Sequence, residues 1–173
     1  FHLLNLLLAL LTGANGIVKT ATVKKIFASK AKPFLLELES DGSGNPRSTL
    51  VIFKKGDDLR ADMLVQTMLY LFNALWKNSY LSMTPFAFQY KVLPMGPDIG
   101  CVEFVTESES LQKFDFATSW KSLTPEQRRI FICSAAGGFV SGWVLGIRDR
   151  HQGLHKHFKV CCYKLLNLSL QII

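Results

Sequence analysis

The chain has 173 residues, of which 49% are hydrophobic and 19% are charged, and this share of apolar side chains favours a globular domain over a disordered chain. Lysine and arginine number 20 against 13 aspartate and glutamate, so the formal net charge is +7. This charge suits an anionic partner, such as a nucleotide phosphate or an anionic lipid, although ordinary solvated lysines would give the same count. The basic residues are spread thinly, so we expect no nucleic-acid partner.

The cysteines and the opening residues bear on the compartment. No spacing typical of a thiolate metal site links the four cysteines, which are Cys101, Cys133, Cys161 and Cys162. Free cysteines fit a reducing, cytoplasmic compartment. The apolar run at residues 3–11 is too short to span a bilayer, so residues 1–12 are expected to form a core helix rather than a signal peptide or a membrane anchor.

Alternating β-branched and apolar residues in the first half of the chain predict strands. A cluster of turn-forming residues at 41–46 is typical of a connection between antiparallel strands. The predicted strands are residues 17–27, 33–39 and 48–54. Apolar residues at helical spacing, with an acidic pair at their start, then predict a helix over residues 58–76.

The second half of the chain predicts two short strands and a long helix. The strands are expected at 92–94 and 100–105, around a turn rich in Gly and Pro. Thr124 followed by Pro125 is a helix-start signature, and this helix is expected to run to about Leu145. The order of elements indicates an α+β fold, a pattern that many folds share.

Lys54 at a predicted strand end, followed by Gly56 and an acidic helix start, forms a plausible phosphate site. A lysine anchored on a strand can reach a nucleotide phosphate as a point charge. An acid on the following helix, for which Asp62 is the best placed, can hold the ammonium by an ion pair. The alternative is an ordinary solvated lysine near a turn.

Residues 52–64, with the sequence IFKKGDDLRADML, resemble the signature of the phosphatidylinositol 3- and 4-kinase catalytic domain, with Ala61 in place of the usual Gln. Further segments resemble that family in the same chain order. They are residues 29–34, similar to its phosphate-covering loop, residues 100–105, similar to the strand that holds adenine, and residues 134–151, which end in its Asp-Arg-His triplet.

The resemblance implies a two-lobed protein-kinase-like fold of the α+β class, truncated, with an antiparallel N-lobe sheet and a partial helical C-lobe. The partial catalytic domain is expected at residues 1–152. Its N-lobe would span about 17–105 and its C-lobe about 106–152. Residues 153–173 do not match the family and are expected to be a divergent tail that packs poorly or forms a helix foreign to a kinase C-lobe.

The resemblance also implies a set of nucleotide-binding residues. They are Ser29, Lys54, Asp62, Glu103 and Val105. Ser29 and Lys54 would contact the phosphates of ATP, and backbone N–H and C=O groups at Glu103 and Val105 would pair with the adenine edge. Ser29, Lys54 and the Glu103–Val105 backbone are expected to face one common cleft.

The implied catalytic residues are Asp149, Arg150 and His151. In the family, the Asp and His of this triplet lie beside the attacking inositol hydroxyl, where they orient it and assist removal of its proton, and His is the readier base near neutral pH. Taken alone, the triplet would be interpreted as a surface ion pair with a loop histidine.

The resemblance stops directly after the triplet. The family has Asn three residues after its His, and a later D-F-G motif supplies the main carboxylate for magnesium. Here Leu154 stands in the Asn position, and residues 153–173 contain no Asp. ATP and Mg²⁺ are therefore the cofactors that the family implies, while no metal ligand is expected in this chain, and His155 and His157 are interpreted as a chance pair.

The resemblance implies a phosphoinositide kinase that phosphorylates an inositol-ring hydroxyl, and this chain by itself is expected to be inactive. Gly146-Ile147 favours the 3-kinases, whereas Arg148 matches neither the 3-kinase nor the 4-kinase pattern. Expected partners are ATP, a phosphoinositide lipid at a membrane surface and a regulatory protein subunit, with a cytoplasmic location and peripheral association with membranes. The alternatives are a non-catalytic kinase-like fragment that binds nucleotide or a protein partner, and a protein kinase of the same superfamily.

Overall fold

The computed structural model describes residues 5, 9, 17–28, 32–42, 45–79, 82–106 and 115–147. The chain divides into two compact units. The first contains residues 1–66 and 90–104, and the second contains residues 67–89 and 105–173. The expected helix at 1–12 lies outside the described residues except for Asn5 and Ala9, which are both helical.

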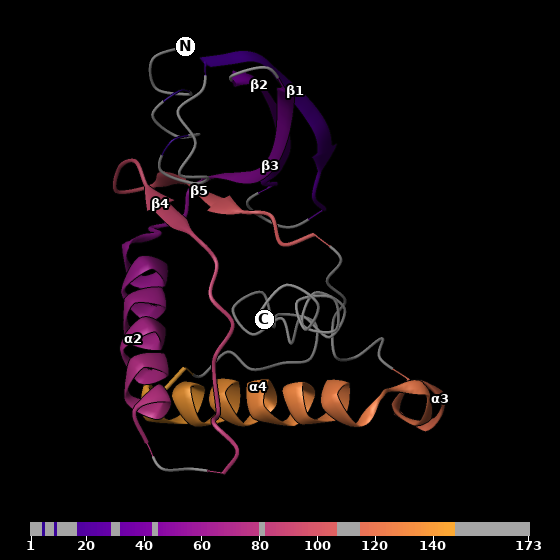
Figure 1. Ribbon diagram of the computed structural model, residues 1–173. Helices are drawn as coiled ribbons and strands as arrows, with labels where there is room; N and C mark the ends of the chain where they lie inside the picture. Colours follow the sequence, from indigo (N-terminus) through magenta and orange to yellow (C-terminus); the bar gives the residue numbers. More distant parts are fainter. Residues whose placement is uncertain are drawn as a thin grey trace. The chain divides into compact units, whose positions relative to one another are not determined.

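The first unit is built on a five-stranded sheet (Figure 1). Its strands are β1 (Ile17–Ile26), β2 (Phe34–Gly42), β3 (Asn45–Lys55), β4 (Val92–Pro94) and β5 (Ile99–Glu103). The strand order is β1-β2-β3-β5-β4, and every neighbouring pair is antiparallel. The five predicted strands are therefore confirmed. Strands β2 and β3 run further into the predicted turn than expected, because Gly42 pairs with Asn45.

One face of this sheet carries the core of the first unit. Val18, Leu38, Val51 and Cys101 are almost fully buried there. Val51 and Phe53 alternate with Ile52 and Lys54 along β3, and Phe53 lies opposite Cys101 on β5. Since directly opposed residues of an antiparallel pair share a face, the core residues of β3 and β5 point to the same side of the sheet.

Cys101 gives a direct test of this core. Its side chain is 1% exposed, and burial raises the pKa of its thiol to about 12. The thiolate is the reactive form, so iodoacetamide at pH 8 is expected to leave Cys101 unmodified in the native protein and to alkylate it in urea. Peptide mass spectrometry gives the extent of labelling, and rapid labelling of the native protein would contradict the packing of β3 against β5.

The helix predicted at 58–76 is α2 (Arg60–Lys77). Asp58 precedes it and accepts a hydrogen bond from the Arg60 N–H at 3.0 Å, which satisfies one of the unpaired donors at a helix start. Leu59 is fully buried, and a Cβ at Gly100 would lie 2.7 Å from the Leu59 Cδ1 atom. The sheet therefore packs against the beginning of α2, and only residues up to 66 belong to the unit that contains the sheet.

The second unit contains α3 (Phe116–Ser122) and α4 (Pro125–Val144). The predicted start of α4 is confirmed. The Gln127 N–H donates to Thr124 Oγ1 at 3.2 Å, and the Thr124 N–H donates to Gln127 Oε1 at 2.9 Å, so both halves of a capping box are present. Helix α3 was not predicted. It packs on α4 through edge-to-face ring contacts, since Phe116 and Trp120 both lie against Phe131.

An extended segment at residues 82–89 lies against both long helices within this unit. Asn73 on α2 accepts a hydrogen bond from the Ala87 N–H at 2.7 Å and donates one to the Ala87 carbonyl at 2.8 Å. The Phe86 N–H donates to the Cys133 carbonyl on α4 at 3.2 Å. Gly137 provides the space for this approach, because a Cβ there would lie 2.3 Å from the Phe86 carbonyl. The antiparallel sheet and the helices together confirm the predicted α+β class.

Candidate functional site

Lys54 lies near the end of β3, beside the strand that was expected to hold adenine. Lys54 pairs directly with Gly100 on β5, and Ile52 pairs with Val102. On the other side of β3, Ile52 pairs with Leu35 of β2. Because opposed residues share a face, Leu35, Ile52 and Val102 form an apolar strip on the face that carries Lys54. The strip and the lysine lie on the face opposite to Val51, Phe53 and Cys101, and Leu35 and Val102 of the strip are themselves buried.

The ammonium of Lys54 is held by an aspartate. Lys54 Nζ lies 3.1 Å from Asp57 Oδ2, and the side chain of Lys54 is 16% exposed while that of Asp57 is 43% exposed. Asp57 comes before α2, whereas the expected partner was an acid on the helix. The pairing of Lys54 with Asp62 stays a prediction.

A tight turn brings Asp57 back to Lys54. Gly56 has a φ of +85°, a conformation that glycine adopts at little cost and other residues rarely adopt. Its N–H donates to the Asp98 carbonyl at 2.6 Å, which ties the turn to the connection between β4 and β5. The Gly-Asp-Asp segment is thus a turn that places two neighbouring aspartates against different cations.

The second aspartate of the turn, Asp58, binds Arg60 instead. Both carboxylate oxygens of Asp58 accept hydrogen bonds from the Arg60 guanidinium, at 2.9 and 3.1 Å from Nε and 2.6 Å from Nη2. These bonds, with the bond from the Arg60 N–H, lower the pKa of Asp58 to about 2. This pair organises the start of α2 and leaves Asp57 to Lys54.

The pH dependence of this pair can be tested directly. The pKa of Asp58 is about 2 in the fold and about 3.9 for an unperturbed Asp, so the pair stabilises the fold above about pH 4 and loses its contribution as the pH falls toward 2. An NMR titration of the Asp58 carboxyl is expected to give a higher midpoint in Arg60→Gln than in the unchanged protein, because the guanidinium bonds are lost while the backbone N–H bond remains. Equal midpoints would show that Arg60 does not hold this carboxylate.

The structure restricts which backbone groups of Glu103, one of the residues expected to contact adenine, are open to a ligand. The Glu103 N–H donates to the Lys91 carbonyl at 2.9 Å, and the Lys91 N–H donates to Glu103 Oε2 at the same distance. Any adenine contact at Glu103 therefore has to be made by its carbonyl rather than by its N–H. Val105 is buried and is the first residue of the segment that belongs to the second unit.

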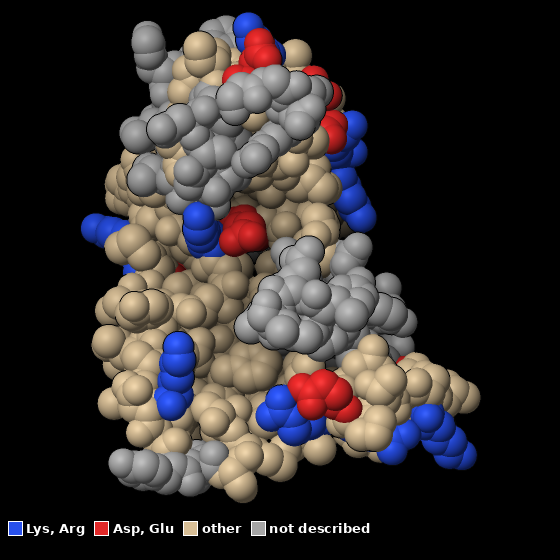
Figure 2. Space-filling view, in the orientation of Figure 1, with Lys and Arg blue, Asp and Glu red and all other residues tan. Residues whose placement is uncertain are grey.

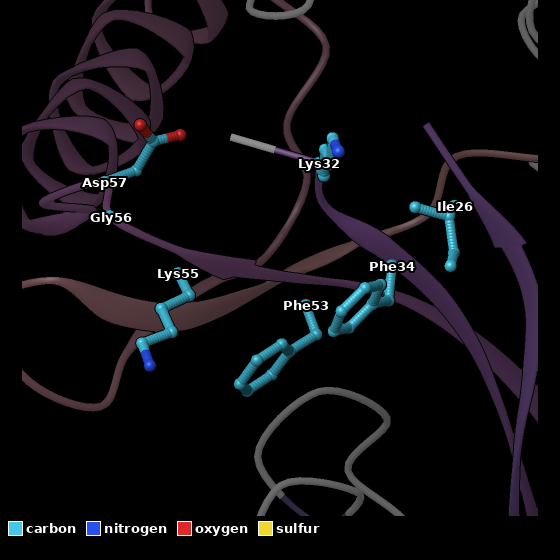
Figure 3. Close-up of a pocket in the computed structure, with 7 residues that line it drawn as sticks. All are labelled: Ile26, Lys32, Phe34, Phe53, Lys55, Gly56 and Asp57. Carbon is cyan, nitrogen blue, oxygen red and sulfur yellow. The ribbon is translucent and has the colours of Figure 1, made fainter. Parts of the chain in front are cut away.

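A hollow of about 770 Å³ lies at the end of β3, and the sequence did not indicate it (Figure 3). Its lining consists of Ile26, Lys32, Phe34, Phe53, Lys55, Gly56 and Asp57. The rings of Phe34 and Phe53 are parallel, with centroids 6.2 Å apart, and Figure 3 shows the Lys55 side chain extending away from Asp57. The alternation of Phe53 and Lys55 with Lys54 was the available signal that Lys55 faces away from the candidate phosphate site.

Tyr90 is a further residue of the first unit that the sequence did not indicate. Burial raises its pKa above the ordinary value, and the charge of Asp62 adds to this effect. Its N–H donates to Gln66 Oε1 on α2 at 3.1 Å. This bond ties Tyr90 to α2 at Gln66, four residues after Asp62.

Ser29, Asp149, Arg150 and His151 lie outside the described residues, as do residues 153–173. Among the residues that are described, no group of three or more His, Cys, Asp and Glu side chains could hold a metal ion. Within the same residues, no helix is long and apolar enough to cross a membrane. Figure 2 shows charged side chains of both signs in small, separate groups rather than in a basic stripe on this face.

The strand-end lysine, the Gly-Asp-Asp turn and the neighbouring strand β5 lie together in the first unit. The family model for phosphatidylinositol 3- and 4-kinases matches residues 48–118, which include these features. The chain belongs to the phosphatidylinositol 3- and 4-kinase family. Members of this family are lipid kinases, which are transferases.

Individual relatives point to the 3-kinases. The chain is 36% identical over 153 residues to the phosphatidylinositol 3-kinase VPS34 of Arabidopsis thaliana, and 38% identical over 152 residues to the root isoform of phosphatidylinositol 3-kinase of Glycine max. Each match covers 79% of this chain and 18% of the relative. VPS34 of Saccharomyces cerevisiae is 32% identical over 143 residues, which is 73% of this chain and 16% of that protein. The chain thus spans less than a fifth of the length of these relatives.

Proposed function

We propose that this chain is part of an ATP-dependent kinase that phosphorylates an inositol-ring hydroxyl of phosphatidylinositol lipids, with the 3-kinases as the favoured branch. The observation that carries the proposal is the register of β3 with β5, which sets Lys54 directly opposite Gly100 and one residue pair from Ile52 and Val102. A cation at the end of an apolar strip suits a nucleotide, whose base is flat and apolar and whose phosphates are anionic.

Residues of the first unit would each contact a different part of ATP. Leu35, Ile52 and Val102 would cover a face of the adenine ring, and the Glu103 carbonyl would accept a hydrogen bond from its amino group. Lys54 would reach a phosphate oxygen as a point charge, since its ammonium has three donors and one ion pair with Asp57. Asp62 is proposed as a further acid beside this lysine.

The remaining site residues are proposed on the family resemblance. Ser29 would donate to a phosphate from the covering loop, and Val105 would complete the adenine contacts. Asp149 and His151 would orient the attacking hydroxyl and take up its proton, with Arg150 between them in the triplet. Magnesium supplies charge neutralisation at the phosphates in this family. No group of the described residues fits it, so no step is assigned to it here.

A chimera tests the proposal without depending on residues 153–173. Residues 17–151 would replace the equivalent segment of the Arabidopsis phosphatidylinositol 3-kinase, and the product would be assayed with labelled ATP and phosphatidylinositol vesicles. We expect lipid phosphorylation at the 3-position. Lys54→Met is expected to reduce the rate by about a hundredfold or more, because it removes a preorganised charge from the transferred phosphoryl group.

Lys55→Met is the matched control, because Lys55 lies on the other face of β3 and lines the hollow there. It is expected to keep most of the activity. A folded chimera that leaves lipid unmodified, or one that loses equal activity with either substitution, would contradict the proposal. Phosphorylation of a protein substrate in place of lipid would support the protein-kinase alternative.

A second candidate is a non-catalytic chain that binds nucleotide only. Leu154 in place of the family's Asn and the lack of Asp in residues 153–173 favour it, because an aliphatic side chain has no lone pair for a metal. Association with a membrane surface and with a regulatory subunit is proposed for either candidate on the family resemblance alone. Lipid turnover by the 173-residue chain itself would exclude this second candidate, while both candidates predict ATP binding that depends on Lys54.

A further inference from the structure

Two adjacent aspartates in the turn after β3 have different partners. Asp57 forms its ion pair with Lys54 at 3.1 Å, whereas Asp58 binds the Arg60 guanidinium and the Arg60 N–H. Asp58 therefore belongs to the start of α2. Asp57 instead pairs with Lys54 at the end of β3, so its role can be tested separately from the contacts at the start of α2.

The backbone holds Asp57 in place through contacts on both sides. The positive φ of Gly56 reverses the chain directly after Lys55, and the Gly56 N–H is tied to the Asp98 carbonyl at 2.6 Å. On the other side of Asp57, Asp58 is fixed by its bonds to Arg60 and Leu59 is fully buried. A carboxylate on such a turn loses little freedom when it forms an ion pair, because its backbone is already ordered.

The Lys54 side chain, unlike the Asp57 carboxylate, is not ordered by its backbone. A lysine side chain is long and has many rotamers, so an unrestrained ammonium is poorly positioned to bind one phosphate oxygen. The Lys54 side chain is 16% exposed, and an ion pair in such a partly desolvated place is less screened than one on the open surface. With one donor given to Asp57, two ammonium donors are left for a ligand.

We propose that Asp57 is a positioning residue that holds the Lys54 ammonium in the orientation in which it receives a nucleotide phosphate. This rests on the proposed function for its ligand and on the Lys54–Asp57 geometry for its mechanism. Asp57 acts through Lys54. Its effect is to order the cation before the nucleotide arrives, which lowers the entropic cost of binding.

The experiment uses the full 173-residue chain with ¹⁵N-labelled lysine, and compares Asp57→Asn with Asp58→Asn. NMR of the lysine ammonium groups, assigned with Lys54→Arg, reports the order of the Lys54 side chain without any nucleotide. We expect the Lys54 signal to show a restrained ammonium in the unchanged chain and in Asp58→Asn, and a mobile one in Asp57→Asn. Titration with ATP is expected to show about tenfold weaker binding for Asp57→Asn and a change within about twofold for Asp58→Asn.

The outcomes separate this proposal from the proposed function. A mobile Lys54 in the unchanged chain, or unchanged ATP affinity in a folded Asp57→Asn chain, would overturn the role of Asp57. Failure of the unchanged chain to bind ATP would contradict the proposed function, and the Lys54 signal would still decide whether Asp57 orders the ammonium. Should Asp57→Asn not fold, Asp57→Glu retains the charge one methylene further away, and partial restraint with weakened ATP binding is then expected.

Discussion

A Gly137→Ala substitution is expected to destabilise the second unit by about 1–3 kcal/mol, although alanine is normally the better residue inside a helix. The added Cβ would lie 2.3 Å from the carbonyl carbon and oxygen of Phe86, a distance at which backbone has to move. That movement would also strain the hydrogen bond from the Phe86 N–H to the Cys133 carbonyl on α4. Urea unfolding followed by circular dichroism measures the loss.

Ala136→Gly is the control for this prediction, because it changes helix propensity by about 1 kcal/mol at the preceding position of α4. Gly137→Ala should lower the free energy of unfolding by more than Ala136→Gly does, although alanine has the better helix propensity. A Gly137→Ala protein more stable than the unchanged one would mean that residues 82–89 do not approach α4 as closely as described. Gly137 lies within residues 134–151, the segment that resembles the family and ends in the Asp-Arg-His triplet.

The second large effect expected is the absence of phosphate transfer by the 173-residue chain alone. Phosphoryl transfer depends on positioning and on neutralisation of the phosphate charge. Loss of one preorganised charge partner costs about a hundred- to thousandfold in rate, and loss of both metal ligands should cost more. The purified chain, incubated with labelled ATP, magnesium and phosphatidylinositol vesicles, is therefore expected to give no more product than its His151→Ala variant.

Turnover well above the His151→Ala control would show that Leu154 and the missing D-F-G are compensated within this chain. Such a result would remove the argument for a chain that only binds nucleotide. If the chain is inactive while the chimera with the Arabidopsis kinase is active, residues 17–151 are competent for catalysis and the defect lies outside them. The assay of the 173-residue chain and the assay of the chimera therefore show together whether residues 17–151 are competent for catalysis.

Much of the fold followed from local patterns. The five strands and α4 were predicted within a few residues, because β-branched alternation and the Thr124–Pro125 start depend on neighbouring side chains. Helix α3 was missed, since it is only seven residues long and its ring contacts with Phe131 join residues on two helices. The sequence also indicated Lys54 as a site residue from its place at a strand end.

Other features required the tertiary structure. The pairing of β3 with β5 joins residues about fifty positions apart, so no local pattern could predict that Lys54 lies opposite Gly100. The structure likewise decided that the Glu103 N–H donates to the Lys91 carbonyl, and that Phe53 and Lys55, which line the hollow, lie on the face away from Lys54. These are outcomes of strand order and register, which depend on long-range pairing.

The two aspartates after Gly56 show the division between sequence and tertiary structure most clearly. By itself the sequence determined the class of protein, because the Gly-Asp-Asp segment and the ordered motifs are local strings that the family shares. It could not determine which carboxylate holds Lys54, and it favoured Asp62 on helical grounds. The tertiary structure brought Asp57 to 3.1 Å from the ammonium, because a positive φ at Gly56 and its bond to the Asp98 carbonyl turn the chain back on the strand.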